Sequence, residues 1–230
     1  MESNLISICI PAYDMNRAGS KCLKQLLQSI KAQQYTNYEV VVSDHSTNNA
    51  IKDVCNSFND NNIKHLFNTK DIGSSSGNLN NAIDNASSDY IKIMFQDDFF
   101  VTKDALDIIN KKFNEPAKWG ASACIHYSSD SSSFYRPHYP RWQLNIKRGE
   151  NTIGCPSVSF FNRCELRFDT NLLWYMDTDF YYRLFQKYGE PNIENKILIG
   201  VREDNTRVSN TLITDELINR ENQIISKKYV

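Results

Sequence analysis

The chain has 230 residues, of which 40% are hydrophobic and 23% are charged, so it can bury a real core and is not a disordered, collagen-like or coiled-coil chain. This length fits one large domain or one domain with an appendage. The formal net charge of −1 leaves no basic excess for a run of phosphates, which argues against a dedicated nucleic-acid-binding protein.

The first half of the chain alternates strand and helix patterns. Strands are predicted at residues 5–10, 38–43, 63–67 and 90–95, and helices at 23–30, 51–58 and 79–86. In the first helix, apolar residues recur at i, i+3, i+4 and i+7 from Leu23. The second strand is apolar on both faces, so it should be central and buried. This alternation predicts βαβ units and an α/β fold with a mostly parallel central sheet flanked by helices.

The second half is less regular. Helices are predicted at 103–113, 177–188 and 215–229, and strands at 119–127 and 152–161. A Ser- and Asp-rich loop at 128–133 precedes an aromatic, basic stretch at 135–142, which we expect to pack over a ligand crevice or to form part of its rim. The C-terminal helix is expected to dock on the core rather than on a membrane, because its basic cluster is small.

The sequence has few features typical of membrane proteins, zinc sites or disulfide-bonded proteins. No apolar stretch approaches the roughly 20 residues that span a bilayer, and the N-terminus lacks the pattern of a signal peptide, so we expect a soluble, cytoplasmic protein. The sequence has Cys 6 times without CxxC spacing. These cysteines are therefore expected to be reduced, buried thiols rather than zinc ligands or disulfides.

Acidic residues follow the predicted strands at the edge where open α/β sheets bind ligands. The strand ends include Ser43-Asp44-His45 and Gln96-Asp97-Asp98. Carboxylates after a buried strand are costly to keep ionised unless a cation neutralises them. Mn²⁺ or Mg²⁺ accepts one or two carboxylates and completes its shell with water and phosphate oxygens, so the pair predicts a metal site shared with a diphosphate. Alternatively, Asp98 only caps the following helix.

Six short motifs occur along the chain in a fixed order. They are residues 8–13 (ICIPAY), 40–46 (VVVSDHS), 73–80 (GSSSGNLN), 95–98 (FQDD), 154–157 (GCPS) and 174–180 (WYMDTDF). Together they resemble the nucleotide-sugar-binding and acceptor-side motifs of the family 2 glycosyltransferases. The resemblance spans residues 5–210 and implies a Rossmann-like GT-A domain at 1–210, with a nucleotide-sugar-binding half at 1–100 and an acceptor-binding half at 101–210. A C-terminal helix at 211–230 would follow it.

The resemblance implies an inverting, metal-dependent transfer of a sugar from a nucleoside diphosphate sugar to a hydroxyl acceptor, in glycan or polysaccharide synthesis. On the donor side it implies that Pro11, Ala12 and Tyr13 border the base and ribose, and that Asp44 hydrogen-bonds the base. Asp97 would hold the ribose or the sugar, and Asp98 would coordinate Mn²⁺ or Mg²⁺. Asn80 and Gln96 complete the implied donor site.

Three positions depart from the common family pattern. Ser43 stands where many relatives have a second acid, Gln96 where an acid or a small residue is common, and Leu79 where many have a basic residue. The first two departures leave the identity of the donor's nucleobase open. The third implies that the metal, Lys70 or another basic residue neutralises the phosphates.

Two carboxylates at the start of the helix at 177–188 compete for the role of general base. Asp177 and Asp179 lie about 200° apart around a helix, so both cannot face one crevice. Asp177 heads the apolar stripe, whereas Asp179 shares its side with Arg183 and Lys187. The pattern favours Asp177 as the catalytic base and Asp179 as a surface ion-pair member. Alternatively, Asp177 only occupies a first turn favoured by the helix dipole.

Two rival functions and several residues remain open. A nucleotidyltransferase on a similar fold would need a Gly-rich, basic loop after the first strand, where the chain has only residues 14–19. A non-catalytic module that binds nucleotide sugars or glycans is not excluded. Arg202 and Arg207 lie where relatives often place a basic element near the phosphates, and their spacing does not separate that role from a solvated loop. Trp142 is suited either to packing or to stacking on a sugar.

Overall fold

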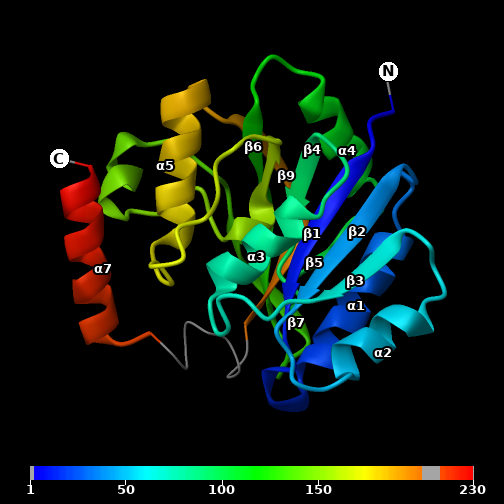
Figure 1. The fold of residues 1–230 in the computed structure, drawn as a ribbon. Coiled ribbons are helices and arrows are strands. Elements are labelled where there is room, and N and C mark those ends of the chain that lie inside the picture. Colours follow the sequence, from blue (N-terminus) through cyan, green and yellow to red (C-terminus); the bar gives the residue numbers. More distant parts are fainter. Residues whose placement is uncertain (1–2, 204–212, 230) are drawn as a thin grey trace.

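The computed structural model describes residues 3–203 and 213–229. Its strands and longer helices are drawn in Figure 1. The strands are β1 (Ile6–Ala12), β2 (Tyr38–Asp44), β3 (Ile63–Phe67), β4 (Tyr90–Ile93), β5 (Phe99–Phe100), β6 (Trp119–Ser128), β7 (Ser133–His138), β8 (Ser159–Asn162) and β9 (Asn192–Glu203). The helices are α1 (Gly19–Lys31), α2 (Ala50–Ser57), α3 (Ser75–Asp84), α4 (Ala105–Phe113), α5 (Met176–Tyr188) and α7 (Asp215–Lys228).

One sheet runs through both halves of the chain. Its strand order is β3-β2-β1-β4-β8-β6-β9-β5, and β7 pairs with β6. The strands β3, β2, β1 and β4 are parallel, as the βαβ alternation predicts. Beyond β4 the sheet is mixed, because β8 runs antiparallel to both β4 and β6 while β9 runs parallel to β6. The α/β prediction is therefore confirmed, with the parallel part in the N-terminal half.

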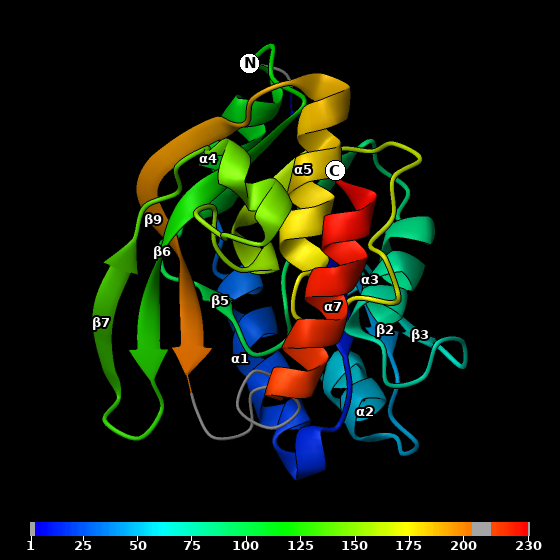
Figure 2. The same cartoon turned by 90° about the vertical axis from the view of Figure 1, so that its left-hand side faces the viewer.

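Helices cover both faces of this sheet. The contacts of α3 are with β1 and β2, and those of α1 are with β5 and α2. In Figures 1 and 2, α1 and α4 lie on the opposite face from α3, and α5 and α7 lie side by side at the edge next to the C-terminus. The three valines of β2 (Val40, Val41 and Val42) are fully buried, so the prediction of a central, buried strand is confirmed.

Several segments differ from the sequence predictions. The strand predicted at 152–161 is limited to β8 and follows a short 3-10 helix at Pro156–Val158, and the two-residue strand β5 was not predicted. The strand β9 was not predicted, because its sequence NIENKILIGVRE interrupts the apolar alternation with charged residues. In the aromatic, basic stretch at 135–142, residues 135–138 lie in β7, an exposed hairpin strand on β6, and Trp142 packs against Trp119 and Phe185. None of its residues lines the cavity described below, so the expectation that this stretch packs over the crevice or forms part of its rim is wrong.

Two further expectations concerned the state of the cysteines and helices that could span a membrane. All six cysteines are free, with Cys155 and Cys164 half-buried and the others buried. No helix within the described residues is both long enough and apolar enough to traverse a lipid bilayer.

Candidate active site

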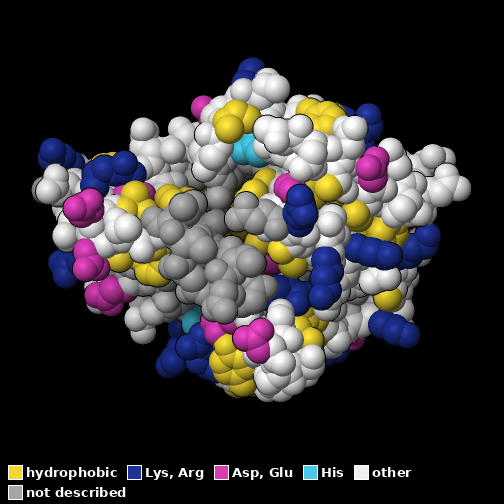
Figure 3. All heavy atoms as spheres, turned by 90° about the horizontal axis from the view of Figure 1, so that it is seen from below, with side chains coloured by type: hydrophobic (Ala, Val, Ile, Leu, Met, Phe, Trp, Pro, Cys, Tyr) yellow, Lys and Arg dark blue, Asp and Glu magenta, His cyan; other side chains and the backbone are white. Residues whose placement is uncertain are grey.

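A cavity of about 420 Å³ opens at the carboxyl ends of β1 and β4. This is the edge where parallel α/β sheets bind ligands, and Figure 3 views the molecule from that end. The site residues predicted from the sequence that line the cavity are Pro11, Tyr13, Gln96, Asp97, Asp98 and Asp177. The fold thus brings residues from the first strand and from α5 into one space, although they are far apart in sequence.

Gln96 joins the ends of two neighbouring strands. Its Oε1 accepts a hydrogen bond from the Tyr13 backbone N–H at 2.9 Å, and its Nε2 donates to the Tyr13 carbonyl at 2.9 Å. Gln96 is 3% exposed, whereas the Tyr13 side chain is exposed at the cavity rim. An acid at position 96 could accept the first bond but could not donate the second. The amide therefore fixes the loop that carries the Tyr13 ring.

The acidic turn that follows β4 is held by Arg202 of β9. The Arg202 backbone N–H donates to Asp98 Oδ1 at 3.2 Å, and its Nε donates to the Asp97 carbonyl at 3.1 Å. Another arm of the guanidinium donates to Ser129 Oγ at 2.7 Å. Arg202 is 7% exposed, so it does not lie in a solvated loop but supports the acidic turn. Arg207 lies outside the described residues.

The donor set at this turn fits a divalent cation shared with a phosphate ligand. Asp98 is 5% exposed and lines the cavity beside Asp97. Asp98 Oδ1 accepts from the Arg202 backbone N–H at 3.2 Å, and Oδ2 accepts from the Cys155 thiol at 3.9 Å. Among the described residues, no three His, Cys, Asp or Glu side chains are grouped to hold a metal. One or two carboxylates with phosphate and water ligands are what Mg²⁺ and Mn²⁺ accept.

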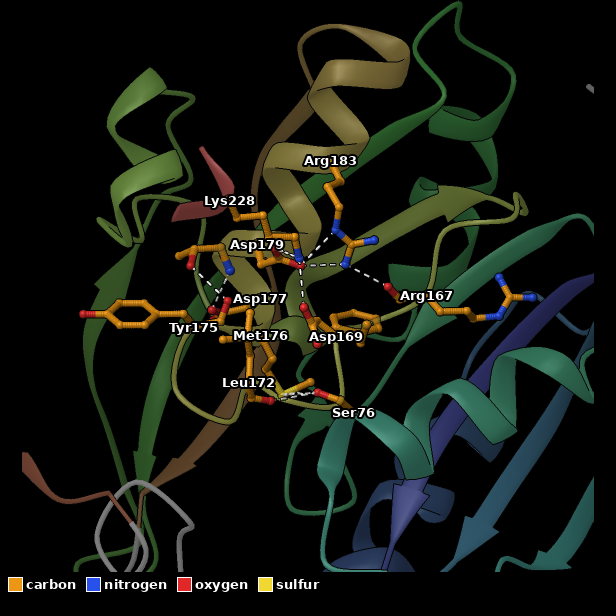
Figure 4. Close-up of polar contacts among 12 residues, drawn as sticks. Ser76, Arg167, Asp169, Leu172, Tyr175, Met176, Asp177, Asp179, Arg183 and Lys228 are labelled. Carbon is orange, nitrogen blue, oxygen red and sulfur yellow. Dashed lines mark hydrogen bonds and ion pairs between the residues drawn. The ribbon is translucent and has the colours of Figure 1, made fainter. Parts of the chain in front are cut away.

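Asp177 lies in the first turn of α5 (Figure 4), and it also lines the cavity. Its Oδ1 accepts from the Thr178 N–H at 2.7 Å, and its Oδ2 accepts from Asn151 Nδ2 at 2.7 Å. Burial raises the pKa of Asp177 to about 7, against the opposing effect of these hydrogen bonds. A carboxylate with this pKa is suited to take a proton near neutral pH. Asn151, which orients it, was not predicted, because no motif marks that loop position.

Asp179 points to the other side of α5, as the helical spacing predicts. It pairs with Arg183 Nη2 at 2.7 Å and with Lys228 Nζ at 2.6 Å, and it accepts from the Tyr229 hydroxyl. The side chain is fully buried, so the expectation of a surface ion pair is wrong. Lys228 comes from the C-terminal helix α7, which lies along α5 in Figure 2. Lys187 instead pairs with Glu165.

Three residues predicted for the donor site lie outside the cavity lining. Asp44 is fully buried, accepting from the Ser46 N–H at 2.8 Å and lying 2.9 Å from His65 Nε2. The Asn80 side chain accepts a hydrogen bond from the Phe168 backbone N–H at 2.8 Å and donates one to the Phe168 carbonyl at 2.8 Å. Ala12 is buried, and its carbonyl accepts from Asn78.

Asn78 lines the cavity and was not predicted. Besides donating to the Ala12 carbonyl at 3.0 Å, it accepts from Ser43 Oγ at 2.6 Å. The sequence carries a usable signal for it. Ser74 caps α3 by accepting from the Gly77 N–H, which starts the helix earlier than its apolar residues indicate and puts Asn78 in the first turns.

The sequence matches glycosyltransferases in two comparisons with known proteins. The sequence model of Glycosyl transferase family 2 matches residues 7–171. An uncharacterized glycosyltransferase of Rickettsia typhi is 25% identical over 225 residues, covering 92% of this chain and 68% of its own length. A GalNAc(5)-diNAcBac-PP-undecaprenol beta-1,3-glucosyltransferase of Campylobacter jejuni is 28% identical over 112 residues, which is 48% of this chain and 35% of that protein.

Solved structures match the fold over almost the whole chain. S. aureus TarS 1–349 in complex with UDP-GlcNAc has a TM-score of 0.74 at 14% identity, covering 98% of this chain and 66% of that one. A mannosyltransferase from Pyrobaculum calidifontis in complex with GDP-Man and Mn²⁺ has a TM-score of 0.60 at 18% identity, covering 100% of this chain and 62% of that one. The chain thus spans about two thirds of the length of these structural neighbours.

Proposed function

The chain belongs to glycosyl transferase family 2 and has the GT-A fold, and from this premise we propose that it moves a sugar from a nucleoside diphosphate sugar to a hydroxyl group, with inversion and with a divalent metal. One observation carries the proposal. A single cavity joins the buried acidic turn after β4 to Asp177, a carboxylate whose pKa is raised to about 7.

The donor occupies the β1–β4 side of the cavity. Pro11 and the exposed Tyr13 ring border the base and ribose, and Gln96 keeps the Tyr13 loop in place through its paired hydrogen bonds. Asp97 contacts the ribose or the sugar. Asp44, Ala12 and Asn80 act from outside the lining, by holding the loops and strand ends that form this side.

Asp98 would hold Mn²⁺ or Mg²⁺ together with the diphosphate of the donor. A cation held there would offset the negative charge that develops on the leaving diphosphate. Arg202 keeps the 97–98 turn in shape through the Asp98 carboxylate and the Asp97 carbonyl. The Pyrobaculum neighbour, which was solved with GDP-Man and Mn²⁺, supports this assignment as a precedent on the same fold.

Asp177 accepts the proton of the acceptor hydroxyl. Asn151 and the Thr178 N–H hold its carboxylate toward the cavity, so the carboxylate stays in one orientation. The acceptor oxygen attacks the anomeric carbon from the face opposite the diphosphate, which inverts the configuration. General-base catalysis of this kind contributes about 10² to 10⁴ in rate, and the cavity adds positioning of the two substrates.

A screen of nucleotide sugars tests this function. UDP- and GDP-linked sugars are incubated with the protein in Mn²⁺ and in EDTA, and binding and slow hydrolysis of the donor are measured. We expect one donor to bind and to be hydrolysed in Mn²⁺ but not in EDTA. Equal binding in EDTA contradicts the metal role. Tight binding without turnover, even with a panel of glycan acceptors, favours a non-catalytic module.

A further inference from the structure

Glu221 of α7 is a charged residue buried completely inside the protein. Its Oε1 accepts from the Leu173 N–H at 2.8 Å, and its Oε2 accepts from the N–H groups of Trp174 and Tyr175 at 2.9 and 3.1 Å. A buried carboxylate costs several kcal/mol unless its lone pairs are satisfied. Three backbone donors satisfy it here, and Arg220 Nη2 lies 3.5 Å from Oε1, so the buried carboxylate holds one particular loop of the chain.

This loop leads directly into α5 and the proposed base. Tyr175 is the N-cap residue of α5 and makes no side-chain cap hydrogen bond, and Glu221 adds a carboxylate at the N-terminal end of this helix to those of Asp177 and Asp179 in its first turn. Leu173, Trp174 and Asp177 all line the cavity. Any shift of the loop relative to α7 therefore moves a cavity wall and the first turn that carries Asp177.

A second set of charges fastens α7 to the same helix. Lys228 pairs with Asp179 at 2.6 Å and with Asp169 at 2.9 Å, as Figure 4 shows. On the opposite side, Ser76 of α3 donates to the Leu172 carbonyl at 3.1 Å (Figure 4). The loop at 172–175 is thus held between α3, on the donor side, and α7. Figure 2 shows α7 lying along α5.

We propose that α7 supports the acceptor wall of the cavity, with Glu221 as a positioning residue that fixes Trp174 and the first turn of α5 for the transfer step. This proposal rests on the proposed function. It predicts that donor binding and turnover depend on Glu221 to different extents. Donor binding relies on β1 and β4 and should not need Glu221, whereas turnover relies on the placement of Asp177 and should.

The test compares Glu221→Gln with Glu216→Gln, a matched change at an exposed position of the same helix. Backbone hydrogen exchange is measured by mass spectrometry, affinity for UDP and GDP with Mn²⁺ by calorimetry, and turnover as hydrolysis of a nucleotide sugar. For Glu221→Gln we expect faster exchange at residues 173–175 with unchanged exchange at 96–98. Nucleoside diphosphate affinity should stay within about twofold, while hydrolysis falls about tenfold or more, since misplacement by about 1 Å can cost 10²-fold. Glu216→Gln should match the wild type.

Glu221→Asp keeps the charge on a shorter side chain and should restore part of the lost rate. Wild-type exchange at 173–175 in Glu221→Gln overturns the proposal, as does wild-type hydrolysis in a variant with faster exchange. Equal losses of turnover and nucleotide affinity also overturn it, because they indicate a general loss of structure. If the wild type hydrolyses no donor, the proposed function fails, and the exchange comparison still decides whether Glu221 holds the loop.

Discussion

The two sides of the cavity are built in different ways. On the donor side, the functional residues follow β1 and β4 directly and are fixed by the backbone of a parallel sheet and by Gln96. On the acceptor side, Asp177 sits on a helix whose approach loop is held by side chains from α3 and α7. The donor side is therefore placed by the ends of neighbouring parallel strands, with Arg202 of β9 as a further support, whereas the acceptor side depends on side chains of the helices α3 and α7.

The largest expected effect separates catalysis on the acceptor side from binding on the donor side. Asp177→Asn keeps the size and polarity of the side chain but cannot take a proton. We expect turnover to fall by about 10² to 10⁴ while affinity for UDP or GDP hardly changes. Steady-state kinetics and calorimetry on the same preparation check this. Unchanged turnover would remove Asp177 from the role of base.

Asp98→Ala tests the donor side, where we expect nucleotide binding itself to change. Without this carboxylate the dependence of nucleoside diphosphate affinity on Mn²⁺ should disappear. Turnover should fall by about two orders of magnitude, because a bound metal supplies several kcal/mol of transition-state stabilisation. Calorimetry in Mn²⁺ and in EDTA checks the first part. A variant that still binds more tightly in Mn²⁺ would place the metal elsewhere.

Asp179→Asn tests the charge cluster behind the acceptor side. Arg183 and Lys228 would lose a fully buried partner, while both remain partly exposed to solvent. We expect the free energy of unfolding to fall by about 2 kcal/mol, less than for a completely buried pair. Urea unfolding measures it. If Asp179→Asn instead abolishes turnover in a stable protein, the two aspartates exchange roles.

The pH dependence should follow Asp177. A base with a pKa of about 7 is mostly protonated at pH 6, so we expect hydrolysis there to be about tenfold slower than at pH 8. Because this pKa is raised from the ordinary aspartate value of 3.8, the native state binds more protons between the two values, and the contribution of Asp177 to stability falls as pH rises through that window. Thermal melts of Asp177→Asn should lack this pH-dependent loss.

The smallest effect is expected at Asp44. Its carboxylate holds the Ser46 N–H and lies against His65, next to His45 on the cavity wall. Asp44→Asn should weaken nucleoside diphosphate binding by about 1 kcal/mol, which is the size of one hydrogen bond lost indirectly. Calorimetry checks this value. A loss above about 3 kcal/mol would show that Asp44 contacts the base directly.

The sequence by itself determined the parallel half of the fold and its acidic edge. Short apolar strands and helical periodicity are local signals, and carboxyl ends of parallel strands meet at one edge whatever lies beyond them. The strand pattern alone therefore predicts that the 97–98 pair and Tyr13 share one crevice, and both line the cavity. The placement of Asp177 rather than Asp179 at the cavity was equally local, since the helical repeat alone sets which side each faces.

Only the tertiary structure decided which charged side chains are buried. The sequence predicted Asp179 on the surface, left Arg202 open between a role near the phosphates and a solvated loop, and gave no signal for Glu221, yet all three are buried. Besides Arg183 on the same helix, Asp179 pairs with Lys228 on α7, while Arg202 contacts the acidic turn and Glu221 contacts the 173–175 backbone. A carboxylate becomes inexpensive to bury only when distant donors converge on it, and sequence spacing carries no record of that convergence.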